Sequence, residues 1–481
     1  MDKRAKITIA AVTLILMMPF LILPTSAMTP IQTSWHGSAT SGAVMPEGSS
    51  IILENQSIRF DISDFPDFQN DEGYSAKVET EYGFYNPTDS EITLKMVYPI
   101  GKEPSYQPGV LGTIDPTKYS VKVNGESVDA TLRHGFDTDY LYDPYAFASG
   151  LSDDFIDKGI LTPNTTVTKY IFKQSGVKPN YAYVGFDIRE SDLELNGSCL
   201  YFGEYSRAWD LDYENGAIRV NSITKENGDL HTLYVFGGDL EKLPEWKFYK
   251  GADVEDGTEI EGEMEFVKKE TTTLSDFVFT YYDESLGISE VDWYNMAVTE
   301  LSLTIENDRV FTYLPGLNNN FNGYTVRGLV YELTVKPGER VNNVLTSPIY
   351  PSVDEGYEPT VYTYQYIINI NSLIPVNKID VTVNTSSYII NDYDLGCEKV
   401  EGGYRLSIDP TEMKSQTADK YIELAFDLCE AENPEATKPK VPTILWILLI
   451  LFLPIVLVIA VINLVGDGVE FVINKMKEII K

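Results

Sequence analysis

The sequence predicts a mainly β protein with two or more β-sandwich units of the immunoglobulin-like type, a small helical insertion and one C-terminal transmembrane helix. Three observations lead to this fold class. Short segments of alternating apolar and polar residues are separated by Gly, Pro and Asn turns. Tyrosine is abundant, with 32 residues among 481, and aromatic and β-branched residues favour strands. Residues 444–465 form an uncharged apolar run. At 43% hydrophobic residues, the chain is able to bury real cores.

The N-terminus has the pattern of a secretory signal. Lys3, Arg4 and Lys6 precede an apolar stretch at 7–23, and Thr25-Ser26-Ala27 offers small residues before a cleavage point. We therefore predict a signal peptide over 1–27, with an uncleaved anchor as the alternative. Residues 28–48 are rich in Ser, Thr, Gly and Pro without a period, which predicts a flexible leader.

Residues 49–250 are predicted to form an N-terminal β-rich ectodomain. The segments 74–85 and 91–100 alternate and are separated by a short turn, a spacing that predicts a hairpin. Asn124-Gly125 predicts a second hairpin because both residues accept the positive φ of a type I′ turn. Alternation fails over 137–158, which predicts a loop or a short helical insertion. Further strands are expected at 50–62, 166–172, 181–188, 217–223 and 231–236.

Residues 251–310 change character and are interpreted as an acidic and helical connector. The spacing of apolar residues predicts helices within 273–283 and 289–302. Ser289 followed by Asp292 has the spacing of a capping box. Trp293, Met296, Ala297 and Leu301 fall on one helical face, and we expect this face to be core.

Residues 311–430 are predicted to form a C-terminal immunoglobulin-like β-sandwich. Several short alternating strands, the first at 324–335, are divided by turns such as Lys336-Pro337-Gly338-Glu339. Residues 431–443 are polar and are interpreted as a stalk.

The C-terminal region is predicted to cross a membrane. Residues 444–465 would span about 33 Å as a helix, enough for a hydrocarbon core of about 30 Å, with a kink near Pro454. The alternative is a buried helix of a soluble core. Residues 466–481 contain an amphipathic segment with Lys475, Lys477 and Lys481, which predicts a cytoplasmic tail on the inner membrane surface or a docking helix for an intracellular partner. The expected location is thus the cell membrane, single-pass, with most of the chain extracellular.

The composition of the chain limits the classes of partner that it can bind. The net charge is −35, and such a surface repels phosphate backbones, so we expect no nucleic-acid partner. Membrane lipid around 444–465 and an extracellular protein or glycan are the partners that the sequence favours.

No catalytic motif is present in the sequence. The three histidines, His36, His134 and His231, stand alone, and no zinc-spaced cluster, nucleophile elbow or phosphate loop occurs. Acidic pairs such as Asp153-Asp154 are expected by chance in so acidic a chain. We therefore predict no catalytic residues and a protein that is not an enzyme.

Three weaker site hypotheses rest on small groups of residues. Asp210, Asp212 and Glu214 offer oxygens at alternate positions before Gly216, which suits calcium, although a solvated turn is the alternative. Cys397 and Cys429 lie in the same predicted unit and would pair in an oxidising exterior. Tyr362, Tyr364 and Tyr366 share one strand face, which would stack on a ligand if exposed and pack in the core if buried.

These features together predict a membrane-anchored, exported cell-surface protein that acts as a non-catalytic binding or structural module. One alternative is an anchored extracellular hydrolase that uses two carboxylates, as glycosidases do. Another is an accessory subunit of a membrane complex or signalling system.

Overall fold

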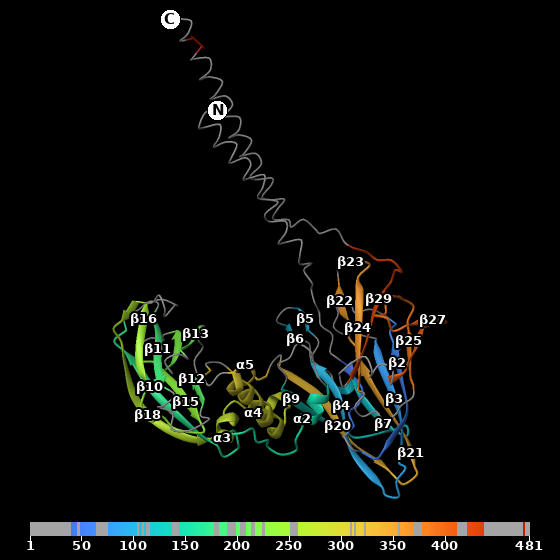
Figure 1. The fold of residues 1–481 in the computed structure, drawn as a ribbon, viewed down its shortest axis with the longest axis horizontal. Helices are drawn as coiled ribbons and strands as arrows, with labels where there is room; N and C mark the ends of the chain where they lie inside the picture. Colours follow the sequence, from blue (N-terminus) through green and yellow to red (C-terminus); the bar gives the residue numbers. More distant parts are fainter. Residues whose placement is uncertain are drawn as a thin grey trace. The chain divides into compact units, whose positions relative to one another are not determined.

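The computed structural model is mainly β, with several antiparallel sheets and a few short helices (Figure 1). The structure describes residues 40–45, 49–63, 76–102, 105–107, 110–111, 116–136, 144–177, 182–189, 199–202, 208–212, 217–223, 227–250, 258–307, 310–311, 314–321, 324–354, 356–369, 378–410, 421–436 and 475–476. The predicted signal peptide and the span at 444–465 lie outside these ranges. In the part of the chain that is described, no helix is long and apolar enough to cross a membrane.

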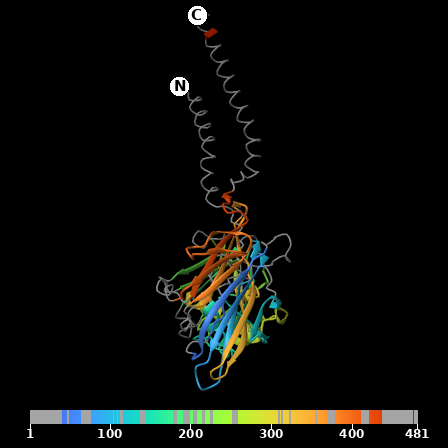
Figure 2. The ribbon, with the colours of Figure 1, turned by 90° about the vertical axis from the view of Figure 1, so that its right-hand side faces the viewer.

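The largest sheet combines strands from both ends of the chain. In spatial order its strands are β27 (Glu398–Val400), β28 (Gly403–Ile408), β25 (Ile379–Asn384), β2 (Ile52–Asp61), β3 (Lys77–Tyr85), β21 (Arg340–Pro348), β7 (Ser120–Val123) and β8 (Glu126–Ser127). β2 and β25 run parallel, with Gln56 opposite Ile379, and Figure 2 shows the blue and orange strands side by side. The other neighbours in this sheet are antiparallel.

Two smaller sheets pack on this one through a shared core. One contains β4 (Ile92–Lys102), β20 (Thr325–Val335) and β9 (Thr131–Phe136). The other contains β1 (Thr40–Ser41), β24 (Val361–Asn369), β29 (Tyr421–Cys429) and β26 (Tyr388–Asn391), with β22 (Ser352–Asp354) also paired to β24. Alternate residues of each sheet point inward, and one apolar cluster joins Phe60, Tyr331, Tyr366 and Phe426. The predicted mainly β architecture is therefore present in this part of the chain.

Residues 166–273, together with residues 310–311, contribute two further sheets. The β10 sheet has the order β18 (Glu263–Thr273), β10 (Thr166–Ser175), β15 (Leu230–Phe236), β12 (Cys199–Phe202) and β19 (Val310–Phe311). The β11 sheet has the order β13 (Ala208–Asp212), β14 (Ala217–Ile223), β11 (Ala182–Arg189), β16 (Glu245–Lys250) and β17 (Thr258–Ile260). The β10 and β11 sheets pack on each other at Phe172 and Trp246, whose ring centres are 4.9 Å apart.

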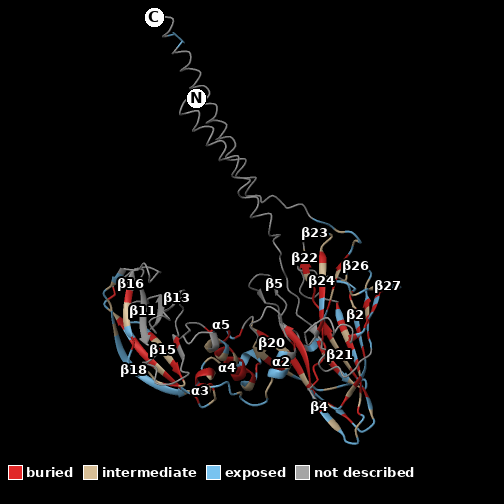
Figure 3. Cartoon of the chain, viewed as in Figure 1, coloured by how far each residue is buried: buried red, intermediate tan, exposed pale blue. Residues whose placement is uncertain are grey.

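The other face of the β10 sheet is partly covered by helices. These are α3 (Leu274–Phe279), α4 (Glu290–Asn307) and α5 (Pro315–Asn318), which share an apolar cluster with the sheet. The core face predicted for α4 is confirmed, since Trp293, Met296, Ala297 and Leu301 are all buried. The Ser289 hydroxyl accepts a hydrogen bond from the Asp292 amide, which is one half of the predicted capping box. The Asp292 carboxylate binds Arg133 and the His134 amide in place of the other half. Figure 3 shows the contrast between these buried helices and the exposed strand β18.

The remaining elements are short. α2 (Pro144–Gly150) lies in the segment where an insertion was expected. The other short elements are η1 (Pro116–Lys118), η3 (Glu284–Leu286), the pair β5 (Ser105–Gln107) and β6 (Val110–Leu111), and the pair β23 (Tyr357–Glu358) and β30 (Glu435–Ala436). The last strand places residues 435–436 of the predicted stalk in a ladder. The predicted turn at Asn124-Gly125 is confirmed, with φ values of 52° and 83° between β7 and β8.

The predicted hairpin of 74–85 with 91–100 is wrong. β3 pairs with β2 and β21, whereas β4 pairs with β20 in the opposite layer. Asn86 fixes this crossover because it is fully buried and its amide donates to the Val335 carbonyl oxygen at 2.8 Å. A short connection between two strands therefore joins two layers here.

The strands pair across the predicted domain boundaries. Strands from 49–250 and from 311–430 share the largest sheet, and residues 35–353 with 362–430 belong to one compact unit. The predicted helical connector contains strands β17 and β18 before its helices. The predicted leader is ordered at its end, since residues 42–45 are buried and Thr40–Ser41 form β1.

Candidate functional site

Four side chains form a row across the β10 sheet. Strand register places Tyr201 of β12 opposite Tyr234 of β15, Tyr234 opposite Lys169 of β10, and Lys169 opposite Glu270 of β18. Directly opposed residues of an antiparallel ladder lie on the same face, and neighbouring strands are about 4.8 Å apart. The register therefore places two tyrosines, a lysine and a glutamate in a line on one face of the sheet.

Helix α3 forms a wall beside this row. The chain leaves β18 at Thr273, whose hydroxyl caps the helix by accepting from the Asp276 amide at 3.1 Å. The buried Phe277 ring then lies 5.1 Å from the Tyr234 ring in an edge-on arrangement. Between the row and the helix is an open groove of about 560 Å³, lined by Lys169, Tyr234, Glu270, Thr271, Thr272, Phe277 and Thr280.

The charged groups of the groove are held in place by their neighbours. The Lys169 ammonium lies 5.7 Å from the centre of the Tyr234 ring, within the range of a cation–π contact. Glu270 accepts a hydrogen bond from Lys268 at 2.6 Å, and this contact lowers the pKa of Glu270 below its ordinary value. The groove thus presents an ammonium donor and a charged carboxylate acceptor side by side.

The buried end of the row is tied to the helices behind it. The Tyr234 ring stacks on Tyr201 at 5.6 Å, and the Tyr201 hydroxyl donates to the Asn318 side chain of α5 at 3.2 Å. The Glu300 carboxylate of α4 accepts from the backbone amides of Gly316 and Leu317 at 2.6 and 2.8 Å. Burial of Glu300, opposed by these two hydrogen bonds, raises its pKa to about 7.

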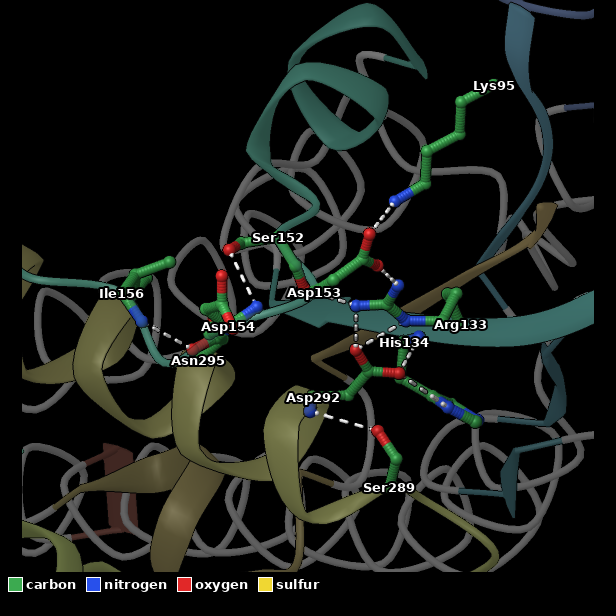
Figure 4. Close-up of polar contacts among 10 residues, drawn as sticks. All are labelled: Lys95, Arg133, His134, Ser152, Asp153, Asp154, Ile156, Ser289, Asp292 and Asn295. Carbon is green, nitrogen blue, oxygen red and sulfur yellow. Dashed lines mark hydrogen bonds and ion pairs between the residues drawn. The ribbon is translucent and has the colours of Figure 1, made fainter. Parts of the chain in front are cut away.

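A second polar cluster joins strand β9 to helix α4 (Figure 4). The Arg133 guanidinium donates to Asp292 at 2.8 Å through Nε and to Asp153 at 2.7 Å through Nη1. The second oxygen of Asp292 accepts from the His134 backbone amide at 2.9 Å. Asp292 is 1% exposed and Asp153 is 68% exposed, so the pair reaches from the core to the surface.

The contacts around this cluster satisfy its charges. Burial disfavours the ionised form of Asp292, but the hydrogen bonds from His134 and the charge of Arg133 outweigh it and lower the pKa of the carboxyl. Lys95 binds the outer carboxylate, Asp153, at 2.5 Å. Asn295 adds two hydrogen bonds to the backbone of Asp154 and Ile156. Both carboxylate oxygens of Asp292 are therefore engaged, which suits a clamp for α4 better than a general base.

The residues of the calcium hypothesis are only partly described. Asp210 and Asp212 lie in strand β13, opposite Arg219 and Ala217, and Glu214 lies outside the described residues. Within the described ranges, no group of three or more His, Cys, Asp or Glu side chains is arranged to hold a metal. Calcium binding at this site stays a prediction.

The expected Cys397–Cys429 disulfide is not formed in the structure. Cys429 ends strand β29 opposite Tyr388, where it is fully buried. Cys397 follows the turn after β26, and its amide donates to the Asp392 carboxylate at 2.8 Å. Burial and the nearby Asp392 charge raise the pKa of the Cys397 thiol to about 11.

The tyrosine surface expected at 362, 364 and 366 is absent because this strand face is the inner one. Tyr364 and Tyr366 are 0% and 1% exposed, and the Tyr366 hydroxyl shares a 2.6 Å hydrogen bond with Thr80. Tyr362 is half-buried at the rim, against Tyr350 and Val353. The core alternative of the hypothesis is the one that the structure supports.

Sequence reasoning missed the row of Tyr201, Tyr234, Lys169 and Glu270. Lys169 and Tyr234 lie in segments that were predicted as strands, but Glu270 lies in the segment interpreted as connector. The one available signal is that these strands alternate, and alternation does not reveal which residues of separate strands face each other.

Comparisons with known proteins identify no family. No protein-family model matches the chain, and no curated protein matches it. A solved structure from Legionella pneumophila, provisionally described as a nutrient binding protein, is 9% identical, with a TM-score of 0.33 over 82% of this chain and 72% of that one. The N-terminal domain of a Streptococcus gordonii adhesin is 11% identical, with a TM-score of 0.12 over 86% of this chain and 89% of that one. Likenesses this weak carry no argument about function.

Proposed function

We propose that this chain is an exported cell-surface protein, held in the membrane by residues 444–465, that works by binding a ligand rather than by catalysis. The observation that carries the proposal is the groove between the Tyr234–Lys169–Glu270 row and helix α3. Its volume of about 560 Å³ lies within the usual range of about 300–1,000 Å³ for ligand sites. An aromatic ring, a donor and an acceptor converge there.

The two ends of the sequence support the location. A basic and then apolar N-terminal segment is typical of export, and the uncharged run at 444–465 is long enough to span a bilayer. The net charge of −35 keeps such a body soluble and apart from other acidic surfaces. These features favour a body outside the cell with a short tail at 466–481 inside.

The contacts of the carboxylates Asp292, Asp153 and Glu300 support binding over catalysis. Asp292 and Asp153 approach each other across Arg133, but both are engaged in ion pairs with it. Glu300 is occupied by two backbone amides. A carboxylate pair for hydrolysis would need one ionised and one protonated group facing a shared cleft.

Binding is tested with envelope fragments from a strain that lacks the protein. The full-length wild-type protein in detergent should sediment with the fragments, and Lys169→Ala should reduce this binding about tenfold because a charged hydrogen bond is lost. Lys173→Ala is the matched control, since Lys173 is an exposed residue of the same strand and face. Equal binding by both variants would contradict the role of the groove.

The location is tested on intact cells. The protein should stay with membranes through a carbonate wash, and external protease should remove the body but leave a fragment that contains 444–481. Release by carbonate, or a body that protease cannot reach in intact cells but digests in lysates, would refute the anchored topology.

A further inference from the structure

The lining of the groove identifies the class of its ligand. We propose that the groove binds an uncharged saccharide; this inference rests on the proposed function and deepens it. Lys169 and Glu270 oppose each other in the same row, and Glu270 is also paired with Lys268, so a strongly charged ligand of either sign would meet a group of its own sign. Hydroxyl groups of Thr271, Thr272 and Thr280 complete the polar lining. The Thr280 hydroxyl donates to the Phe277 carbonyl oxygen at 2.6 Å, so it is left to accept from a ligand. The groove therefore offers both donors and acceptors.

A saccharide matches both parts of this lining. Its hydroxyl groups donate and accept, as does the Tyr234 hydroxyl, while Lys169 only donates and Glu270 only accepts. Its C–H faces need an apolar surface, which the Phe277 ring and the ring of Tyr234 provide. One polar side chain per strand, about 4.8 Å apart, suits a ligand with hydrogen-bonding groups distributed along its length.

Other ligand classes fit less well. A polyanion would meet Glu270 and a chain of net charge −35. A lipid would need an enclosed apolar cavity, whereas the threonines here are exposed. A peptide strand would add to the edge of β18, but Lys268, Lys269 and a bulge between Ile171 and Phe172 in its ladder with β10 are features that protect sheet edges.

The direct test uses the full-length protein in a detergent without a sugar headgroup. Cellobiose, maltose and β-1,4-mannobiose, whose hexose units all carry vicinal diols, are titrated by calorimetry, and we expect at least one of them to bind. Lys169→Ala and Tyr234→Phe should each weaken that binding about tenfold, since each removes one hydrogen-bonding group. Lys173→Ala should change it less than about twofold, and all three variants should melt like wild type.

A second test separates the ligand class from the proposed function. Envelope fragments are oxidised with periodate, which cleaves vicinal diols, or digested with protease, before binding is measured. We expect periodate to abolish the Lys169-dependent binding and protease to leave it intact.

The outcomes are distinct. Binding that survives periodate and is lost after protease would overturn the saccharide inference but keep a surface-binding function with a protein ligand. Failure of all three sugars together with survival of binding after periodate would also overturn the inference. No Lys169-dependent binding to untreated fragments would overturn the proposed function as well.

Discussion

At the residue scale, Glu300 stands out because a carboxylate that is 2% exposed bridges two helices of the core. Its two backbone partners are the amides at the start of α5. Through α5 it is connected to Asn318 and Tyr201, and therefore to the buried end of the groove row. Its ionisation should be visible in the stability of the protein.

We expect the free energy of unfolding to depend on pH through Glu300. Burial raises its folded pKa from 4.5 to about 7, so the folded chain binds the proton more tightly than the unfolded chain. The buried ionised carboxylate therefore destabilises the folded state fully above pH 7. This destabilisation is relieved as pH falls from 7 to 4.5, because the folded chain takes up the proton first. The effect on stability is on the order of 3 kcal/mol.

Chemical denaturation at pH 5 and pH 8 measures this effect. The change in stability between the two pH values should be smaller in Glu300→Gln than in wild type, because the amide does not titrate. Glu290→Gln, an exposed position on the same helix, is the control. A Glu300→Gln profile parallel to that of wild type would show that the buried carboxyl does not titrate in this range.

Asp292 and Asp153 allow a second prediction, because the same arginine binds a buried and an exposed carboxylate. Asp292→Asn leaves the Arg133 charge buried without its main partner and should cost about 3–5 kcal/mol. Asp153→Asn removes a pair that solvent already screens and should cost less than about 1 kcal/mol. Urea denaturation of the two variants measures the difference. Similar losses would mean that the cluster is not a buried clamp.

At the scale of elements, strand β1 fastens the beginning of the described chain to two sheets. Gly42 donates its amide to the Ile367 carbonyl oxygen at 3.0 Å, and Val44 exchanges hydrogen bonds with Val97. Between them, the Ala43 amide donates to the Tyr82 hydroxyl at 2.9 Å. This segment therefore closes the layer that packs on the largest sheet.

The contact at Gly42 can be tested by a double-mutant cycle. A Cβ atom there would lie 2.3 Å from the Tyr82 hydroxyl oxygen, so Gly42→Ala should destabilise the protein by about 1–3 kcal/mol. In a Tyr82→Phe background the oxygen is gone and the same substitution should cost less. Thermal melting of wild type, the two single variants and the double variant gives the coupling free energy between the two positions. Additive effects would show that the two residues do not meet.

Elements with a strong local signal could be predicted from the sequence, and their partners could not. Helix α4 follows from the spacing of Trp293, Met296 and Leu301 and from the Ser289 cap, all of which are local. The predicted hairpin of 74–85 with 91–100 was wrong because the local sequence at Asn86 does not decide the pairing. A short turn is compatible with a hairpin and with a crossing between layers. The groove row depends on register between four strands, which no single segment encodes.

At the scale of the whole molecule, the largest sheet crosses the predicted domain boundaries. β2 pairs with β25, more than 300 positions later in the sequence, so the largest sheet needs strands from both the first and the last part of the body. The composition changes near 251 and 311 do not coincide with the helices, because strands β17 and β18 follow residue 251 and helix α5 follows residue 311. These changes also do not mark the edges of independent units.

The central claim is that ligand binding takes place at the groove beside α3. Hydrogen–deuterium exchange of the full-length protein, with and without envelope fragments, tests it most directly. The account predicts slower exchange in residues 268–280, which line the groove, and unchanged exchange in 398–408, at the far edge of the largest sheet. Protection at 398–408 with none at 268–280 would contradict it.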